Sequence, residues 1–263
     1  MQNTTSSNIE TSTIDQNNSL SNEVVVEMIH LQKSFDNNHV LRDINLVIKK
    51  GENLVILGKS GTGKSVLIKC IVGLEECDYG DLIIFGNNVA TLSEKELIDM
   101  RKRIGFLFQS GALYDSMTVR ENLEFPLRRQ SRSLSKKEMK ALVEEALHNV
   151  GLTQSIGNTP TELSGGMRKR LGLARTLILK PEIMLYDEPT TGLDPITSKE
   201  ISNLIVDVQQ KYHTSSVIIT HDIECARLTA NRIIVIKEGV CVAEGSFNEL
   251  KNSNDEWIRS FFE

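Results

Sequence analysis

The chain has 263 residues, of which 40% are hydrophobic and 25% are charged, and its formal net charge is −5 at pH 7. These proportions are typical of a globular protein and suit one large α/β domain or a core with an inserted subdomain. The negative charge argues against binding to nucleic acid through bulk electrostatics, so we expect no nucleic-acid partner. The cysteines form no C-x-x-C pair, and we interpret them as reduced packing residues in a cytosolic protein.

The N-terminal stretch, residues 1 to about 22, is rich in Asn, Ser and Thr and has few apolar side chains. Such a segment buries too little surface to offset the entropy of ordering, so we predict a disordered tail. The sequence also lacks the basic and apolar regions of a signal peptide and any apolar run near the ~20 residues of a membrane helix. If the protein works at a membrane, we expect another chain to span it.

The first strands are expected at residues 23–31 and 41–48, where apolar residues run together or alternate with polar ones. Phe35 falls between them in a polar stretch that we interpret as a turn. Its aromatic face could stack on an adenine ring, and its type is equally compatible with partial burial in packing.

A phosphate-loop motif, G-x-x-x-x-G-K-S, follows a short apolar strand and precedes a helical pattern. It consists of Gly58, Lys59, Ser60, Gly61, Thr62, Gly63, Lys64 and Ser65, and we call it the phosphate loop. Its glycines let backbone N–H groups turn toward a phosphate at the helix N-terminus. Lys64 can reach the terminal phosphates and the Ser65 hydroxyl can bind Mg²⁺. The motif therefore predicts binding of a nucleoside triphosphate with Mg²⁺.

The middle of the chain changes from strands to helices. A buried strand at residues 104–108 is followed by Gln109, which could reach a metal ion or be an ordinary loop residue. From about residue 112 to 180 the patterns are helical, and one helix opens with the capping box that Ser135 and Glu138 form. We predict a helical insertion in the α/β core.

A second glycine-rich turn, Leu163–Met167 (LSGGM), leads directly into an apolar helix. Ser164 can cap that helix and bind an anion, while Gly165 and Gly166 permit close backbone approach. An ordinary helix cap explains the same residues. We call this segment the signature turn.

Two later strands end in polar side chains. The strand 183–187 ends in Asp187 and is followed by Glu188, a costly pair of acids unless they serve a metal or substrate. We predict that Asp187 holds Mg²⁺ and that Glu188 polarises the attacking water. His221 follows the strand 216–219 and could donate to the γ-phosphate or be structural. A hairpin at 233–245 and a helix at 255–262 are expected to close the chain.

Together these motifs resemble, in kind and order, the ATP-binding subunit of ABC transporters over residues 23–263. The resemblance implies a phosphate-loop (RecA-like) α/β core with an antiparallel β subdomain and an inserted helical signature subdomain at about 112–180. It implies a head-to-tail dimer in which Ser164, Gly165 and Gly166 complete the ATP site of the second copy. The nucleotide-binding set it implies also includes Phe35, Val66, Gln109 and Asp194, with catalytic roles for Lys64, Glu188 and His221.

Three positions depart from the family's commonest pattern: Met167 stands where most members have Gln, Phe35 replaces the more usual Tyr, and Gly192 replaces Ser or Ala. LSGGM, the segment 108–122 and the segment 186–197 resemble the lipid-asymmetry (Mla) ATPases of bacteria. That resemblance implies phospholipid transport at the cytoplasmic face of the inner membrane, with a permease and, through it, an MCE-domain protein as partners. An importer ATPase for another solute such as an amino acid, and a regulatory ATPase of the cell-division type, remain alternatives.

Overall fold

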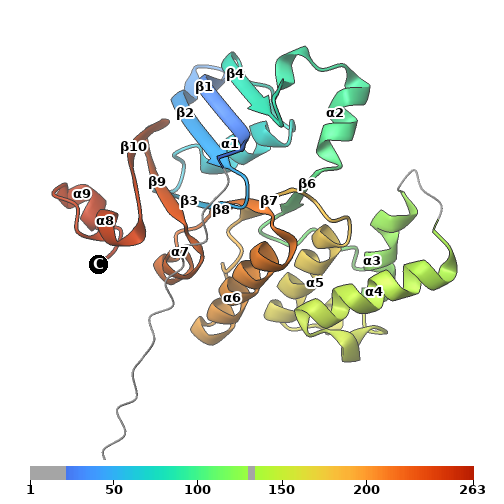
Figure 1. Ribbon diagram of the computed structural model, residues 1–263. Coiled ribbons are helices and arrows are strands. Elements are labelled where there is room, and N and C mark those ends of the chain that lie inside the picture. The colour runs from blue at the N-terminus through green and yellow to red at the C-terminus, as the bar shows by residue number, and fades with distance from the viewer. Residues whose placement is uncertain (1–21, 130–133) are drawn as a thin grey trace, which may run out of the picture.

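The computed structural model describes residues 22–129 and 134–263 (Figure 1). The predicted disordered tail lies outside the described residues, apart from Asn22. The strands are β1 (Val24–Phe35), β2 (Asn38–Lys49), β3 (Asn53–Leu57), β4 (Tyr79–Ile84), β5 (Asn87–Asn88), β6 (Ile104–Leu107), β7 (Ile183–Asp187), β8 (Ser215–Ile219), β9 (Arg232–Lys237) and β10 (Val240–Gly245). The α-helices are α1 (Lys64–Ile71), α2 (Glu94–Arg101), α3 (Val119–Arg128), α4 (Lys136–Val150), α5 (Gly165–Leu177), α6 (Pro195–Tyr212), α7 (Ile223–Thr229), α8 (Phe247–Lys251) and α9 (Glu256–Arg259).

The strands lie in the order β5-β4-β1-β2-β10-β9-β3-β8-β7-β6. One end of this order, β5-β4-β1-β2, is antiparallel, whereas β9, β3, β8, β7 and β6 run parallel. The carboxyl ends of the parallel strands therefore meet at one edge, where polar residues that follow different strands can gather. The predicted α/β core with an antiparallel β subdomain is confirmed.

The central parallel strands are buried on both faces. In β7, Met184 and Tyr186 pack into one apolar cluster, while Ile183 and Leu185 pack into the other. A strand covered on both sides needs no polar residue on alternate positions, which explains why it reads as a continuous apolar run.

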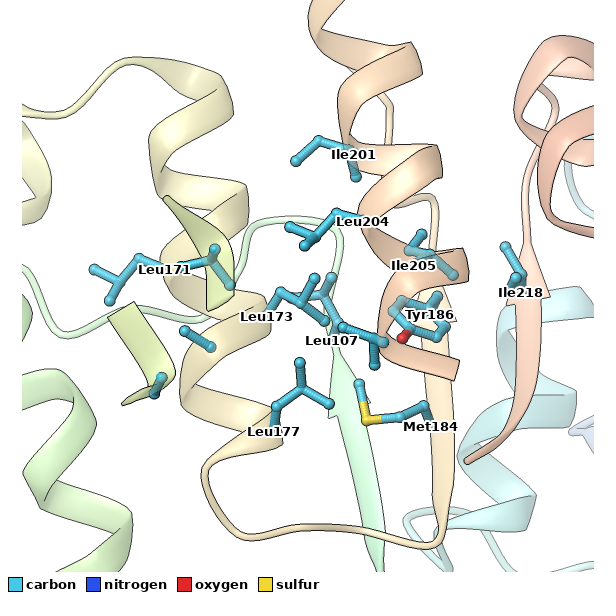
Figure 2. Packing of buried hydrophobic residues seen from close by; sticks show 14 of the residues in the cluster. Leu107, Leu171, Leu173, Leu177, Met184, Tyr186, Ile201, Leu204, Ile205 and Ile218 are labelled. Atoms are coloured by element: carbon cyan, nitrogen blue, oxygen red, sulfur yellow. The ribbon is translucent and has the colours of Figure 1, made fainter. Parts of the chain in front are cut away.

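Helices α5 and α6 lie along one face of the parallel strands, and α3 and α4 pack against α5 (Figure 1). Figure 2 shows Leu107, Met184 and Tyr186 of the sheet surrounded by apolar side chains of two helices, Leu173 and Leu177 from α5 and Leu204 and Ile205 from α6. The predicted helical insertion corresponds to α3, α4 and α5, and the Ser135 capping box at the start of α4 is present. This packing sets the position of the signature turn, which opens α5, relative to the sheet.

Two sequence expectations were wrong in extent. Strand β1 continues to Phe35, because it pairs with β2 as far as Asn38, so Phe35 ends a strand rather than lying in a turn. The terminal helix is only Glu256–Arg259, and Phe262 beyond it packs edge-on against Phe247 instead of extending the helix. Across the described ranges, none of the helices combines the length and apolarity needed to cross a bilayer.

Candidate nucleotide-binding site

The phosphate loop connects β3 to α1, as its sequence predicts. The Lys64 side chain is buried, and its Nζ donates to the carbonyl oxygens of Gly58 at 2.7 Å and Lys59 at 2.9 Å. Burial lowers the pKa of Lys64, and the nearby charges of Glu188 and Asp187 oppose that shift. The backbone of the phosphate loop therefore surrounds the Lys64 amine, whose charge interacts with the carboxylates of Asp187 and Glu188.

The glycines of the phosphate loop allow a backbone path that a side chain would block. A Cβ on Gly58 would lie 2.6 Å from the Ile236 carbonyl oxygen, and one on Gly63 would lie 2.8 Å from the Val40 carbonyl oxygen. Gly63 also has a φ of 95°, which strains any residue with a Cβ. The backbone thus follows a tight path that only glycine permits at these two positions, and a glycine-rich turn of this kind can direct N–H groups toward an anion.

The Ser65 hydroxyl and the Asp187 carboxylate lie together at the phosphate loop. The Ser65 hydroxyl donates to Asp187 Oδ1 at 3.1 Å, although 122 residues separate them. Burial raises the pKa of Asp187, while the hydrogen bond from Ser65 lowers it. A hydroxyl and a carboxylate are hard oxygen donors of the kind Mg²⁺ takes alongside phosphate oxygens and water. The pair therefore fits the metal that the motif predicts.

Glu188 is held from two sides at the end of β7. His221 Nδ1 lies 2.8 Å from Glu188 Oε2, and the Thr191 hydroxyl donates to the same oxygen at 3.1 Å. The Glu188 backbone has a φ of 51°, an unusual value for a residue with a side chain. Its N–H donates to the Ile219 carbonyl oxygen at 2.9 Å, which ties this strained residue to the end of β8.

Gln109 lies just beyond β6 and is exposed. Its backbone carbonyl accepts from Lys169 Nζ at 2.5 Å, and the same amine donates to the Glu188 carbonyl oxygen at 3.2 Å. The structure thus brings the backbones of Gln109 and Glu188 to one shared donor. Metal binding by the Gln109 side chain stays a prediction.

The signature turn lies beside Asp194. Ser164 Oγ accepts from the Met167 N–H at 3.3 Å at the start of α5, and Asp194 caps α6 by accepting from the Thr197 N–H at 3.0 Å. A Cβ on Gly166 would lie 2.4 Å from Thr197 Cγ2, so glycine is needed for α5 and α6 to approach here. The hydrogen bond from the Thr197 side chain lowers the pKa of Asp194.

The signature turn and Phe35 are two further candidate nucleotide contacts. In the part of the chain that the structure describes, no hydrogen bond joins the signature turn or Asp194 to the phosphate loop. Phe35 is 40% exposed at the end of β1, with Lys33 Nζ 5.1 Å from the centre of its ring. One chain therefore presents two separate turns that are suited to anions.

Sequence reasoning missed Thr191 and Lys169. Thr191 carried no signal beyond its place in the turn after Glu188. Lys169 did carry one: it lies four residues before the buried Leu173 in α5, so helical periodicity places it on the apolar face. A lysine in that position is expected to have a buried partner.

The fold and this site together define a phosphate-loop nucleoside triphosphatase. Residues 41–191 match the family model described as "ABC transporter", which covers more than half of the chain. The chain belongs to the ABC transporter family, whose members are built on an ATP-hydrolysing cassette.

Curated relatives support the same family. The chain is 40% identical over 238 residues to the "Probable ribonucleotide transport ATP-binding protein mkl" of Mycobacterium tuberculosis, covering 90% of this chain and 66% of the relative. It is 40% identical over 230 residues to the "Methionine import ATP-binding protein MetN" of Rhizobium johnstonii, covering 88% of this chain and 63% of the relative. The chain thus spans slightly less than two thirds of the length of these relatives.

Solved structures agree in fold. The Clostridium perfringens protein cbiO1, described as part of the ABC transporter complex cbiONQ, superposes with a TM-score of 0.82 at 30% identity, over 90% of this chain and 94% of that chain. The ATP-binding cassette MJ0796, a dimer in a post-hydrolysis state bound to ADP and Pi, superposes with a TM-score of 0.77 at 32% identity, over 84% of this chain and 98% of that chain.

Proposed function

We propose that this chain is the ATP-hydrolysing subunit of an ABC transporter and powers a separate membrane permease. We assign residues 23–263 to its ATP-binding domain, with a helical subdomain at about 112–180. The observation that carries the proposal is the joint placement of two pairs, Ser65 with Asp187 at 3.1 Å and His221 with Glu188 at 2.8 Å. Both pairs lie at the carboxyl end of the sheet, next to the phosphate loop.

The roles follow from position and chemistry. Backbone N–H groups from Gly58 to Val66 and the Lys64 ammonium hold the phosphates of ATP. Ser65, Asp187 and Gln109 hold Mg²⁺, which neutralises charge on the phosphates when bound. Glu188 accepts a hydrogen bond from the attacking water and aligns it with the γ-phosphate. His221 orients the Glu188 carboxylate and donates to the γ-phosphate.

A second copy of the chain completes the site. The signature turn makes no hydrogen bond to the phosphate loop of its own chain among the described residues, which supports a head-to-tail dimer because a second copy can bring the two turns together. In that dimer Ser164, Gly165, Gly166 and Asp194 face the ATP of the partner copy, and Phe35 stacks on the adenine of its own. The dimeric state of the similar cassette MJ0796 supports this arrangement.

A groove beside α5 is the candidate binding site for the permease. It has a volume of about 200 Å³ and is lined by Phe106, Phe108, Pro126, Arg175 and Leu179 among others. Phe108 stacks on Phe106 with ring centres 4.0 Å apart and remains 36% exposed. The groove opens next to the segment after Gln109, which resembles the permease-contacting segment of ABC proteins. We propose that a short helix of the permease binds here.

For the cargo we propose phospholipid, on the resemblance of LSGGM and its companion segments to lipid-asymmetry ATPases. The chain would then act at the cytoplasmic face of the inner membrane, with an MCE-domain protein reached through the permease. A second candidate is an importer of a small solute, which the 40% identity to a methionine-import protein favours. A regulatory ATPase of the cell-division type is a third reading of the same site.

The test is transport by the chain together with its own permease, reconstituted in vesicles. We expect ATP-dependent movement of a fluorescent phospholipid, no movement with Glu188→Gln, and no uptake of labelled methionine. Methionine uptake without lipid movement would replace the lipid assignment with the importer. ATP hydrolysis without any transport would favour the regulatory reading, and absence of ATP hydrolysis would refute the proposed function.

A further inference from the structure

Lys169 is a buried cation in the first turns of α5, two residues beyond the signature turn. Only 7% of the residue is exposed, and burial lowers the pKa of its amine. Removing an ammonium group from water is costly unless the group is well paired. A methionine or leucine would fill this space on the apolar face of α5 at no such cost. The presence of a charge here therefore calls for a specific partner.

The partners are backbone carbonyls of two separate segments. Lys169 Nζ donates to the Gln109 carbonyl oxygen at 2.5 Å and to the Glu188 carbonyl oxygen at 3.2 Å. Gln109 follows β6 and Glu188 follows β7, so one amine joins the ends of two neighbouring strands to α5. Hydrogen bonds from a charged donor are roughly twice as strong as neutral ones, which makes this a firm link.

Residues along one side of α5 contact the backbone of the loop that follows β6. A Cβ on Gly172 would lie 3.3 Å from the Gly111 carbonyl oxygen, so glycine permits the close approach, and Arg175 Nη1 donates to the Ala112 carbonyl oxygen. Lys169, Gly172 and Arg175 recur every three residues and so share one side of the helix. A displacement of α5 must therefore displace this loop as well.

The hydrogen bond from Lys169 helps to hold the backbone conformation of Glu188. Its left-handed backbone conformation is unfavourable for a residue with a side chain. Such strain persists only where the surroundings enforce it. Lys169 binds the carbonyl of this residue, while Ile219 accepts from its N–H and His221 and Thr191 hold its carboxylate.

We propose that Lys169 is a positioning residue that couples the signature turn of a chain to Glu188 and Gln109 of the same chain. The proposal rests on the dimer under "Proposed function". There the signature turn binds the ATP of the partner copy, whereas Glu188 acts on the ATP of its own copy. Because α5 carries both the signature turn and Lys169, occupancy of one ATP site sets the geometry of the other.

The first experiment separates positioning from ordinary packing. Lys169→Met keeps the length and apolar stem but removes the donor, and Lys169→Gln restores a shorter donor. We expect Lys169→Met to lower kcat for ATP on the order of 10–100-fold, the scale of a small misplacement of a reacting group. The affinity of the isolated chain for ATP and its melting temperature should stay unchanged, and Lys169→Gln should recover part of kcat.

Lys140→Met is the matched control, because Lys140 in α4 is 64% exposed and its nearest carboxylate, that of Glu144, is 3.7 Å away. It should behave as the wild type. A Lys169→Met chain with normal kcat, or one whose loss of kcat follows a loss of melting temperature that Lys169→Gln does not repair, would overturn the proposal.

A mixed dimer tests in which site Lys169 acts. One chain carries Lys169→Met and the other carries Ser164→Asp, which keeps a helix cap but turns a carboxylate toward the phosphates. If Lys169 acts on its own Glu188, both defects fall on one ATP site and the other site stays intact. Activity should then equal that of a mixed dimer of Glu188→Gln with Ser164→Asp. Activity as low as that of the Ser164→Asp homodimer would place the effect in the signature turn and overturn the coupling.

A different result would contradict the head-to-tail dimer itself. If the Glu188→Gln and Ser164→Asp mixed dimer is no more active than the Ser164→Asp homodimer, the shared-site arrangement is wrong. The comparison of kcat with ATP affinity in the single variants still decides whether Lys169 positions Glu188.

Discussion

His221 Nδ1 lies 2.8 Å from Glu188 Oε2 and joins the ends of the neighbouring strands β8 and β7. The His221 side chain is 68% exposed, whereas that of Glu188 is 15% exposed. The histidine therefore presents one ring nitrogen to a sheltered carboxylate and leaves most of its ring exposed.

For Glu188→Gln we expect hydrolysis to fall about 10²–10⁴-fold, the usual contribution of a general base. ATP binding should survive, so the variant should accumulate as an ATP-bound dimer. Phosphate release and size-exclusion chromatography with ATP measure the two effects. Glu144→Gln, at an exposed position of α4, is the control. Rapid turnover by Glu188→Gln would remove Glu188 from the mechanism.

His221→Ala removes the contact to Glu188 without opening a cavity, since the side chain is mostly exposed. We expect the free energy of unfolding to change by no more than about 0.5 kcal/mol, as for most surface substitutions. Hydrolysis should nevertheless fall by about tenfold or more, because Glu188 loses an orienting partner. Steady-state kinetics and urea denaturation on the same preparation check this pair of outcomes, and a wild-type rate would contradict it.

Asp187→Asn should separate stability from activity. Burial raises the pKa of Asp187 above its value in an unfolded chain, so the folded state binds the proton more tightly. Wild-type stability therefore falls as pH rises from the unfolded value of 3.8 through the raised folded value, and the loss is complete above it. The asparagine variant lacks this penalty. Without nucleotide at neutral pH it should melt no lower than the wild type, while Mg²⁺-dependent hydrolysis is lost.

The melting curves should be recorded in parallel below pH 3.8 and at pH 8. The advantage of Asp187→Asn over the wild type should be larger at pH 8. An advantage that shrinks as pH rises would show that the Asp187 carboxylate stabilises the empty site.

Two alanine substitutions in the phosphate loop should differ in cost. Gly61 and Gly63 both have positive φ, 80° and 95°, but only a Cβ on Gly63 meets other atoms, at 2.8 Å from Leu41 Cδ2 and Val40 O. Gly61→Ala should cost about 1–2 kcal/mol of unfolding free energy through backbone strain alone. Gly63→Ala adds overlap and should cost about 1–3 kcal/mol more. Chemical denaturation without nucleotide measures both, and equal costs would mean that the contact with β2 relaxes freely.

Phe108→Ala should uncouple the chain from its permease. The side chain lines the groove beside α5, and Ser65, Asp187 and Glu188 are not among the residues that line it. We expect normal hydrolysis by the isolated chain and loss of the complex in co-purification. Tyr79→Ala is the matched aromatic control, since Tyr79 is 66% exposed at the start of β4. Retention of the complex by Phe108→Ala would place the permease elsewhere.

The sequence by itself determined the local chemistry. The phosphate loop could be read because tight turns demand glycine at fixed positions, and β7 because a strand buried on both faces has a continuous apolar run. Short-range signals of this kind also located the Ser135 capping box and the signature turn, since each depends on residues within a few positions of one another.

Only the tertiary structure decided which distant groups meet. Ser65 reaches Asp187 because β3 and β7 flank β8, an order of strands that no local pattern contains. Phe35 lies in a strand because pairing with β2 outweighs its polar neighbours, and the terminal helix stops early because Phe262 packs on Phe247. The helical pattern places Lys169 on the apolar face of α5, but only the packing of α5 on the sheet gives its amine two carbonyls to bind.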